Sequence, residues 1–293
     1  MKNFIFEGSG VAIITPFNST GIDFNKFKEL IEWHIAEGTD AIIVCGTTGE
    51  SPTLPMEEHK ALIECCVNTV SGRIPVIAGA GSNDTLHAVG TTTFSESVGA
   101  DAILSVVPYY NKPTQKGLYN HFKTIANSTK LPVILYNVPG RTSAGLTPDT
   151  VYELSKIPNI VGIKECQFSN VAKIKKLCGN DFAIYSGEDG NIVPVLSLGG
   201  QGVISVMANI IPKTTHSIVK SFLNGDISHS LELQLQVLDL VDALFMESNP
   251  APIKEAMNML GMNVGNCRLP LSNLEESSKL KLSKELKNLN MLL

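Results

Sequence analysis

The sequence predicts an α/β fold, a (β/α)8 (TIM) barrel followed by a C-terminal appendage of three helices. Short apolar runs recur along the first three quarters of the chain, separated by amphipathic stretches of helical length. The runs are continuous rather than alternating, which is typical of parallel strands that are buried on both faces. Eight such strands that alternate with eight helices close most simply as a barrel.

The predicted strands follow one another at regular intervals. They are GVAIITP (10–16), AIIVCG (41–46), PVIAGAG (75–81), AILSVVP (102–108), PVILYNVP (132–139), IVGIKE (160–165), AIYSGE (183–188) and GVISVM (202–207). Between them, Phe27, Leu30 and Ile31 form one helical stripe, and TPDTVYELSK (147–156) opens with an N-cap-like threonine before proline.

The pattern changes after about residue 225. The segments LELQLQVLDLVDALF (231–245), APIKEAMNMLG (251–261) and a Leu/Lys/Glu-rich end indicate three helices and no strand. We therefore predict a barrel over residues 1–224 and a helical region packed on it over residues 225–293.

The composition excludes several classes of protein. A hydrophobic fraction of 43% supplies a large core, and a net charge of −5 argues against nucleic acid or an anionic membrane as the main partner. No run approaches the ~18 apolar residues of a membrane span, and the start MKNFIFEGSG is too short and too acidic for a signal peptide. The six cysteines show no CxxC motif. We expect a soluble protein of a reducing, cytoplasmic compartment.

Polar residues follow the ends of the predicted strands. Chemistry in a barrel of this kind belongs at the C-terminal ends of the strands. There the sequence places GTTGES (46–51), Tyr109-Tyr110, Tyr136 with Arg141 just beyond it, Lys164-Glu165, Gly187-Glu188 and Ile204-Ser205. We expect these side chains to share one rim.

Lys164 follows four apolar or small residues, so its stem should leave the strand inside the barrel or just above it. Burial disfavours the ammonium form of a lysine, and an uncharged amine can attack a ketone and form a Schiff base. The alternative is a lysine that extends to solvent from a strand end.

Other rim residues also have two interpretations. GTTGE has the glycines, hydroxyls and N–H groups of an anion cradle, but it fits an ordinary turn with a threonine N-cap as well. Without the lysine of GxxxxGK[ST] it is no nucleotide P-loop. Tyr136 alone fits a packed core aromatic, and Arg141 alone fits a solvated loop residue. The six histidines form no HxxxH or HExxH pair, so no metal site is predicted.

The combination of a buried-stem lysine, an anion cradle and a tyrosine hydroxyl at one rim is the layout of a class I, Schiff-base aldolase. The stretches GTTGES, VVPYYNKPTQKGLYNHF, LYNVPGRT, IVGIKE and GGQGVISV resemble those of the dihydrodipicolinate synthase (4-hydroxy-tetrahydrodipicolinate synthase) family. This family belongs to the pyruvate-dependent aldolases, together with N-acetylneuraminate lyase. The similarity covers essentially the whole chain.

The resemblance implies condensation of pyruvate with aspartate-4-semialdehyde in the diaminopimelate route to lysine, without metal or organic cofactor. Lys164 matches the lysine that forms the Schiff base with pyruvate. Tyr136 matches the tyrosine that shuttles protons, hydrogen-bonded to the threonine that Thr48 matches, and Tyr110 matches a tyrosine lent by a second subunit. The matches to the substrate-binding positions are Thr47 and Thr48 for the pyruvate carboxylate, Gly187 and Ile204 for the pyruvate pocket, and Arg141 for the carboxylate of the semialdehyde.

Two alternatives to this function differ in what they require. N-acetylneuraminate lyase or another sugar-acid aldolase should carry hydroxyl-bearing residues at 140–142 and two places after the lysine, where this chain has Gly-Arg-Thr and Cys166. A barrel that only senses a keto acid would not need the catalytic positions, all of which are filled. Both comparisons favour the synthase.

The resemblance also bears on regulation and assembly. At positions that match a histidine and a glutamate of the lysine-binding cleft in lysine-inhibited members, this chain has Met56 and His87, although Ser51, His59, Asn83 and Tyr109 fit. Loss of a carboxylate that would hold the effector's ammonium group predicts weak or no inhibition by lysine. A tyrosine donated in trans requires at least a dimer, and the family implies a homotetramer of two tight dimers.

Overall fold

The computed structural model describes residues 4–292, and a closed parallel barrel forms its centre. Eight strands of this described part pair in a ring in the order β1, β4, β5, β6, β7, β8, β9, β10 and back to β1. Their bounds are β1 Gly8–Ala12, β4 Ala41–Val44, β5 Val76–Gly79, β6 Ala102–Val106, β7 Val133–Asn137, β8 Ile160–Glu165, β9 Ala183–Ser186 and β10 Gly202–Ser205. The predicted fold class is confirmed.

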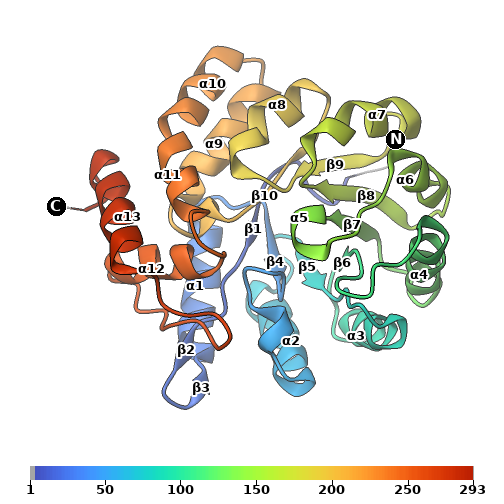
Figure 1. The fold of residues 1–293 in the computed structure, drawn as a ribbon, viewed down its shortest axis with the longest axis horizontal. Helices are drawn as coiled ribbons and strands as arrows, with labels where there is room; N and C mark the ends of the chain where they lie inside the picture. The colour runs from blue at the N-terminus through green and yellow to red at the C-terminus, as the bar shows by residue number, and fades with distance from the viewer. Residues whose placement is uncertain (1–3, 293) are drawn as a thin grey trace.

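Helices surround the ring and connect its strands (Figure 1). The helices that follow barrel strands are α1 Phe24–Ala36, α2 Met56–Val70, α3 Thr85–Ser97, α4 Gln115–Asn127, α5 Pro139–Thr142, α6 Pro148–Ser155, α7 Phe168–Cys178, α8 Ile192–Ser197 and α9 Pro212–Leu223. Short 3-10 turns lie at η1 Ser51–Thr53, η2 Asp189–Asn191 and η3 Met207–Asn209. A small hairpin of β2 (Phe17–Asn18) and β3 (Gly21–Ile22) precedes α1 and was not predicted.

Local sequence accounts for where these helices begin and what they bury. The Asp23 side chain accepts a hydrogen bond from the Lys26 N–H and caps α1, whose buried residues include the predicted stripe Phe27, Leu30 and Ile31. Thr147 caps α6 in the same way, as TPDTVYELSK indicated. The amphipathic stretches therefore place their apolar faces on the strands.

Two apolar clusters form the core. The larger one lies between the strands and the helices. The smaller one fills the inside of the barrel with alternate residues of the strands, among them Ile43, Ile77, Ile134 and Ile204. Phe6, just before β1, closes the end of the interior that lies opposite the rim. Its ring stacks on the Tyr185 ring, with 4.4 Å between the two ring centroids. The barrel is therefore a packed core rather than a channel, and polar chemistry is confined to its rim.

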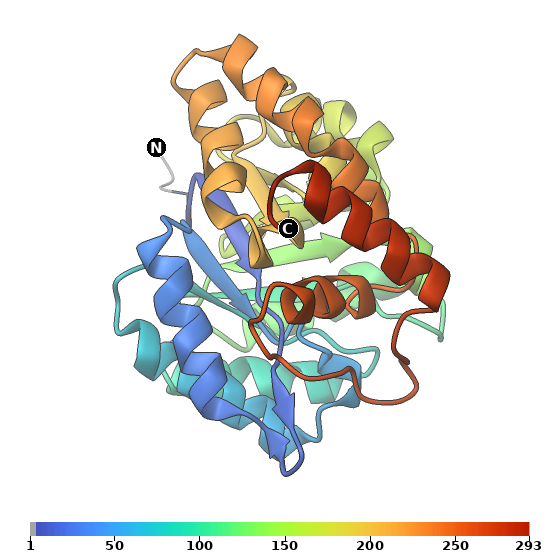
Figure 2. The same ribbon diagram turned by 90° about the vertical axis from the view of Figure 1, so that its left-hand side faces the viewer.

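Within the described residues, the C-terminal region holds helices and no strand, but it has four helices where we predicted three. Its helices are α10 Ile227–Gln236, α11 Leu238–Leu244, α12 Ala251–Met259 and α13 Glu276–Asn288. The predicted helix over 231–245 starts earlier and is divided at Val237, where α10 ends and α11 begins. Figure 2 shows α12 and α13 lying against one side of the barrel, with α11 packed on α13.

No helix within residues 4–292 is long and apolar enough to span a bilayer. The first three residues of MKNFIFEGSG, from which we expected no signal peptide, lie outside the described part of the chain.

Candidate active site

Lys164 and Tyr136 lie side by side at the C-terminal ends of β8 and β7. The strands pair in parallel with Tyr136 opposite Lys164, and both side chains are almost fully buried. The Lys164 Nζ lies 4.4 Å from the centroid of the Tyr136 ring. Burial raises the pKa of the Tyr136 hydroxyl, and the nearby Lys164 charge opposes that rise. Of the two interpretations of Lys164, the structure supports the buried amine over the solvent-exposed one.

The GTTGES loop leaves β4 on the opposite side of the same rim. Thr47 and Tyr136 line a small cavity of about 30 Å³ at the mouth of the barrel. The Thr47 side chain forms the hydrogen bond with the Tyr136 hydroxyl that helps to lower the pKa of that hydroxyl. We expected this partner to be Thr48, and that expectation is wrong. The Thr48 Oγ1 instead accepts a hydrogen bond of 3.0 Å from the Asn249 amide, because the loop turns Thr48 toward the C-terminal region.

Arg141 stands on the short helix α5 rather than in a loop. Its side chain projects into solvent at the rim, and its Nη2 donates to the backbone carbonyl of Asn249 at 3.2 Å. Burial raises the pKa values of Tyr136 and Glu188, and the positive charge of Arg141 opposes both rises. Arg141 is therefore next to the Lys164–Tyr136 pair but nearer the opening of the barrel.

Gly187 closes the other side of Lys164. A Cβ atom at this position would lie 2.3 Å from the Cys166 Sγ and 3.2 Å from the Lys164 Cε. The strand β10 contributes Ile204, which is fully buried in the same interior cluster as Tyr136. Burial raises the pKa of the Cys166 thiol to about 12, so the group beside Lys164 is a neutral thiol.

Tyr110 does not reach the other site residues within one chain. Its side chain is 88% exposed, and its backbone φ is +74°. A left-handed conformation is rare for a bulky aromatic residue, so the loop holds this side chain outward at some conformational cost.

Two acidic residues at the rim were named from the sequence without a role. The Glu165 carboxylate accepts two bonds of 3.0 Å from the Asn137 amide and one of 2.8 Å from the Gln167 N–H. Burial raises the pKa of Glu165 to about 7. It also raises the pKa of Glu188, whereas Cys166, Lys164 and Arg141 lower it. Glu165 therefore ties β7 to β8 one residue beyond the reactive pair, where it lies opposite Asn137.

Asn249 was not among the site residues that we predicted. It precedes α12 and is 4% exposed, with its amide on Thr48 and its carbonyl on Arg141. No local pattern marks it, because both contacts cross more than a hundred residues of chain. The C-terminal region therefore forms part of the wall of the site.

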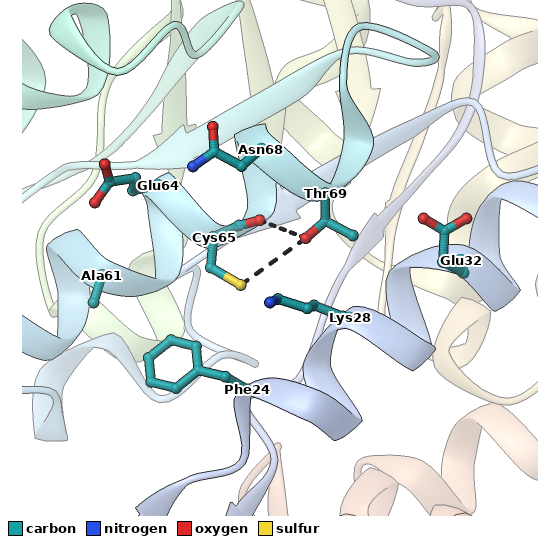
Figure 3. A pocket seen from close by; sticks show the side chains of 8 residues that line it. All are labelled: Phe24, Lys28, Glu32, Ala61, Glu64, Cys65, Asn68 and Thr69. Atoms are coloured by element: carbon teal, nitrogen blue, oxygen red, sulfur yellow. Dashed lines mark hydrogen bonds between the residues drawn. The ribbon is translucent and has the colours of Figure 1, made fainter.

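A larger groove of about 600 Å³ lies elsewhere, on the outer surface between α1 and α2 (Figure 3). Its lining includes Lys28, Glu32 and Glu64, and Cys65 forms hydrogen bonds with Thr69 of its own helix. None of these residues stands at a strand end. The rim is therefore a better candidate for the active site than this groove, because active sites of such barrels lie at the C-terminal ends of the strands.

The chain is similar to known proteins over nearly its whole length. The model of the dihydrodipicolinate synthetase family matches residues 5–289. The chain is 56% identical to the 4-hydroxy-tetrahydrodipicolinate synthase of Acetivibrio thermocellus, covering all of both chains. Two solved structures are also similar. The dihydrodipicolinate synthase of Aquifex aeolicus is 46% identical, with a TM-score of 0.96 over 98% of this chain and 99% of that one.

The second solved structure is a chloride-inhibited dihydrodipicolinate synthase of Acinetobacter baumannii, complexed with pyruvate. It is 42% identical to this chain, with a TM-score of 0.95 over 98% of this chain and 99% of that one. These names confirm the predicted synthase over the sugar-acid aldolase. The chain belongs to the dihydrodipicolinate synthetase family.

Proposed function

We propose that Lys164 forms a Schiff base with pyruvate and that the chain then condenses this adduct with aspartate-4-semialdehyde, as a class I aldolase-type lyase. The pairing of a buried lysine with a buried tyrosine at one strand edge carries the proposal. The pyruvate complex of the Acinetobacter baumannii relative supports the first substrate. The reaction needs no metal or organic cofactor in this proposal, because Lys164 itself supplies the carbonyl chemistry.

The proposed first half of the reaction uses Lys164, Tyr136 and Thr47. The Lys164 amine, once it has given up a proton, attacks the pyruvate carbonyl carbon. Tyr136 passes protons to the departing oxygen, which leaves as water, and Thr47 orients the Tyr136 hydroxyl. The protonated imine then withdraws electrons from the adjacent methyl group, which loses a proton to give an enamine.

The proposed second half joins the two substrates. The enamine carbon attacks the aldehyde carbon of the semialdehyde, whose C=O π bond breaks and whose oxygen takes a proton to become a hydroxyl group. The substrate's own amine then adds to the imine carbon and loses a proton. Collapse of that adduct releases the Lys164 amine and a cyclic dicarboxylate. Gly187 and Ile204 leave room for pyruvate beside the lysine, since a larger residue at 187 would fill the space next to the Lys164 stem.

Each substrate carboxylate has a separate proposed receptor. We assign the pyruvate carboxylate to Thr48 and the N–H groups of the GTTGES loop. The Thr48 oxygen accepts from Asn249, so the hydroxyl hydrogen is available to a carboxylate. Arg141 lies nearer the opening, where a guanidinium can hold the carboxylate of the semialdehyde through two parallel hydrogen bonds.

We further propose a homotetramer, a dimer of dimers, in which Tyr110 enters the site of a neighbouring subunit. The outward position of this tyrosine and its left-handed backbone support a role outside its own chain. Sedimentation of only monomers at working concentration would contradict this assembly. Six free cysteines in the described chain support a reducing, cytoplasmic location.

A coupled assay tests the choice of substrate. Pyruvate with aspartate-4-semialdehyde should give rapid turnover, and pyruvate with N-acetylmannosamine should give none above background. The reverse preference would overturn the proposed function.

A further inference from the structure

A buried ion pair joins the C-terminal region to the GTTGES loop. The Lys254 ammonium of α12 donates to the Glu50 Oε1 at 2.8 Å, and the two side chains are 2% and 0% exposed. The remaining Lys254 donors go to the backbone carbonyls of Thr15 and Asn266, each at 2.9 Å. Every proton of the ammonium group therefore has an acceptor, which is the condition for a buried charge to be tolerated.

The Glu50 carboxylate is held just as completely from the C-terminal side. Its second oxygen accepts a hydrogen bond of 2.8 Å from the backbone N–H of Arg268. Arg268 in turn pairs through its guanidinium with Glu58 on α2. The residues that hold Glu50 thus come from a segment more than two hundred residues further along the chain.

Glu50 has an unusual backbone for a glutamate. Its φ is +58°, in the left-handed region that is unfavourable for a residue with a side chain. Its N–H donates to the carbonyl of Thr47, so this conformation sets the turn that presents Thr47 and Thr48. Such a conformation persists only where tertiary contacts impose it. Here the Glu50 carboxylate is held by Lys254 and by the backbone N–H of Arg268.

We propose that Lys254 is a positioning residue for the carboxylate-binding loop: its ion pair with Glu50 fixes the geometry in which Thr48 and the N–H groups of the loop meet the pyruvate carboxylate. The inference rests on the proposed function, because it assigns the pyruvate carboxylate to this loop. It gives the C-terminal region a part in substrate recognition, although Lys254 itself touches no substrate.

Removal of Lys254 should act through the loop rather than through general instability. The variant Lys254→Met fills the same space but leaves the Glu50 carboxylate buried without its cation. The carboxylate then turns toward solvent, and the backbone of residue 50 leaves the left-handed region. A displacement of Thr47 and Thr48 by even about 1 Å can lower the rate of the reaction with the substrate by up to about a hundredfold.

The experiment measures the pyruvate concentration that gives half-maximal borohydride trapping of the Schiff base in the full-length protein. Lys254→Met should raise that concentration about tenfold or more, while half-saturation by methyl pyruvate, which lacks the carboxylate, stays unchanged. The matched control is Leu282→Ala, a fully buried residue of α13. It should lower the melting temperature but leave the preference for pyruvate over its ester intact.

A second variant tests the same inference in case Lys254→Met does not fold. Glu50→Gln is isosteric and keeps one of the two hydrogen bonds, because an amide accepts only at its single oxygen. It should raise half-saturating pyruvate by a smaller factor, again without effect on the ester.

The outcomes separate the two proposals. No adduct in the unmodified protein overturns the proposed function and this inference with it. An adduct in the unmodified protein, with the same discrimination between pyruvate and ester in the folded variants, overturns the inference alone. Equal loss of discrimination in Leu282→Ala also overturns it, since the effect would then be one of stability.

Discussion

Substitution of Gly187 by alanine tests how closely the wall beside Lys164 is fitted. The new Cβ would lie 2.3 Å from the Cys166 Sγ, whereas ordinary contacts begin at 3.4 Å, and 3.2 Å from the Lys164 Cε. The backbone at 187 cannot move away freely, because its N–H is bonded to the Glu165 carbonyl at 2.9 Å. The sulfur or the lysine stem must therefore give way.

The size of the effect follows from overpacking. Insertion of one methyl group into a filled site costs about 1–3 kcal/mol. If that strain falls on the reactive geometry of Lys164, the rate of Schiff-base formation drops about 5- to 150-fold. The double variant Cys166→Ala/Gly187→Ala removes the sulfur that the new methyl group strikes, so it should recover most of the rate.

The assay is stopped-flow or quenched trapping of the pyruvate adduct with borohydride, with thermal unfolding measured in parallel. Cys166→Ala alone is the control and should react nearly as the unmodified protein does. The reasoning is refuted if Gly187→Ala reacts at the full rate. It is also refuted if the double variant is as slow as the single one.

Three other predictions concern the second substrate, regulation and pH. Arg141→Ala should raise KM for the semialdehyde about 10- to 100-fold in the coupled assay, with pyruvate trapping unchanged; an equal loss in both would contradict its assignment. Lysine should not inhibit at sub-millimolar concentration, because Met56 and His87 offer no carboxylate; a saturating inhibition curve in that range would show this wrong. Burial lowers the pKa of His34 to about 3, so its neutral form stabilises the fold above pH 6.5. That stability is lost as the pH falls below 6.5, by about 2–3 kcal/mol at pH 4.5. His34→Leu should remove this part of the acid dependence in urea unfolding, and an unchanged dependence would count against it.

The sequence was sufficient for the barrel because its signals are local. Each strand is a continuous apolar run, and some helices, such as α1 and α6, carry both an apolar stripe and a capping side chain. The hairpin of β2 and β3 was missed because two residues per strand leave no pattern to read. The division of 231–245 at Val237 was missed for a similar reason, since no glycine or proline marks it.

The site was predictable where a residue ends a strand. Tyr136 and Lys164 each stand one residue before the end of their strand, and parallel pairing of the two strands brings them together. The choice between Thr47 and Thr48 was not predictable from sequence, because it depends on which way the loop turns. The roles of Asn249 and Lys254 could not be predicted from the sequence either, because these residues contact the loop only after the C-terminal region has packed on the barrel.

The identity of the nucleophile is the central claim, and one measurement tests it most directly. The protein is incubated with pyruvate and borohydride, digested, and its peptides are analysed by mass spectrometry, beside Lys164→Ala. The account predicts a carboxyethyl group on Lys164 of the unmodified protein and no stable adduct in the variant. An adduct on another lysine, or none in the unmodified protein, would contradict it.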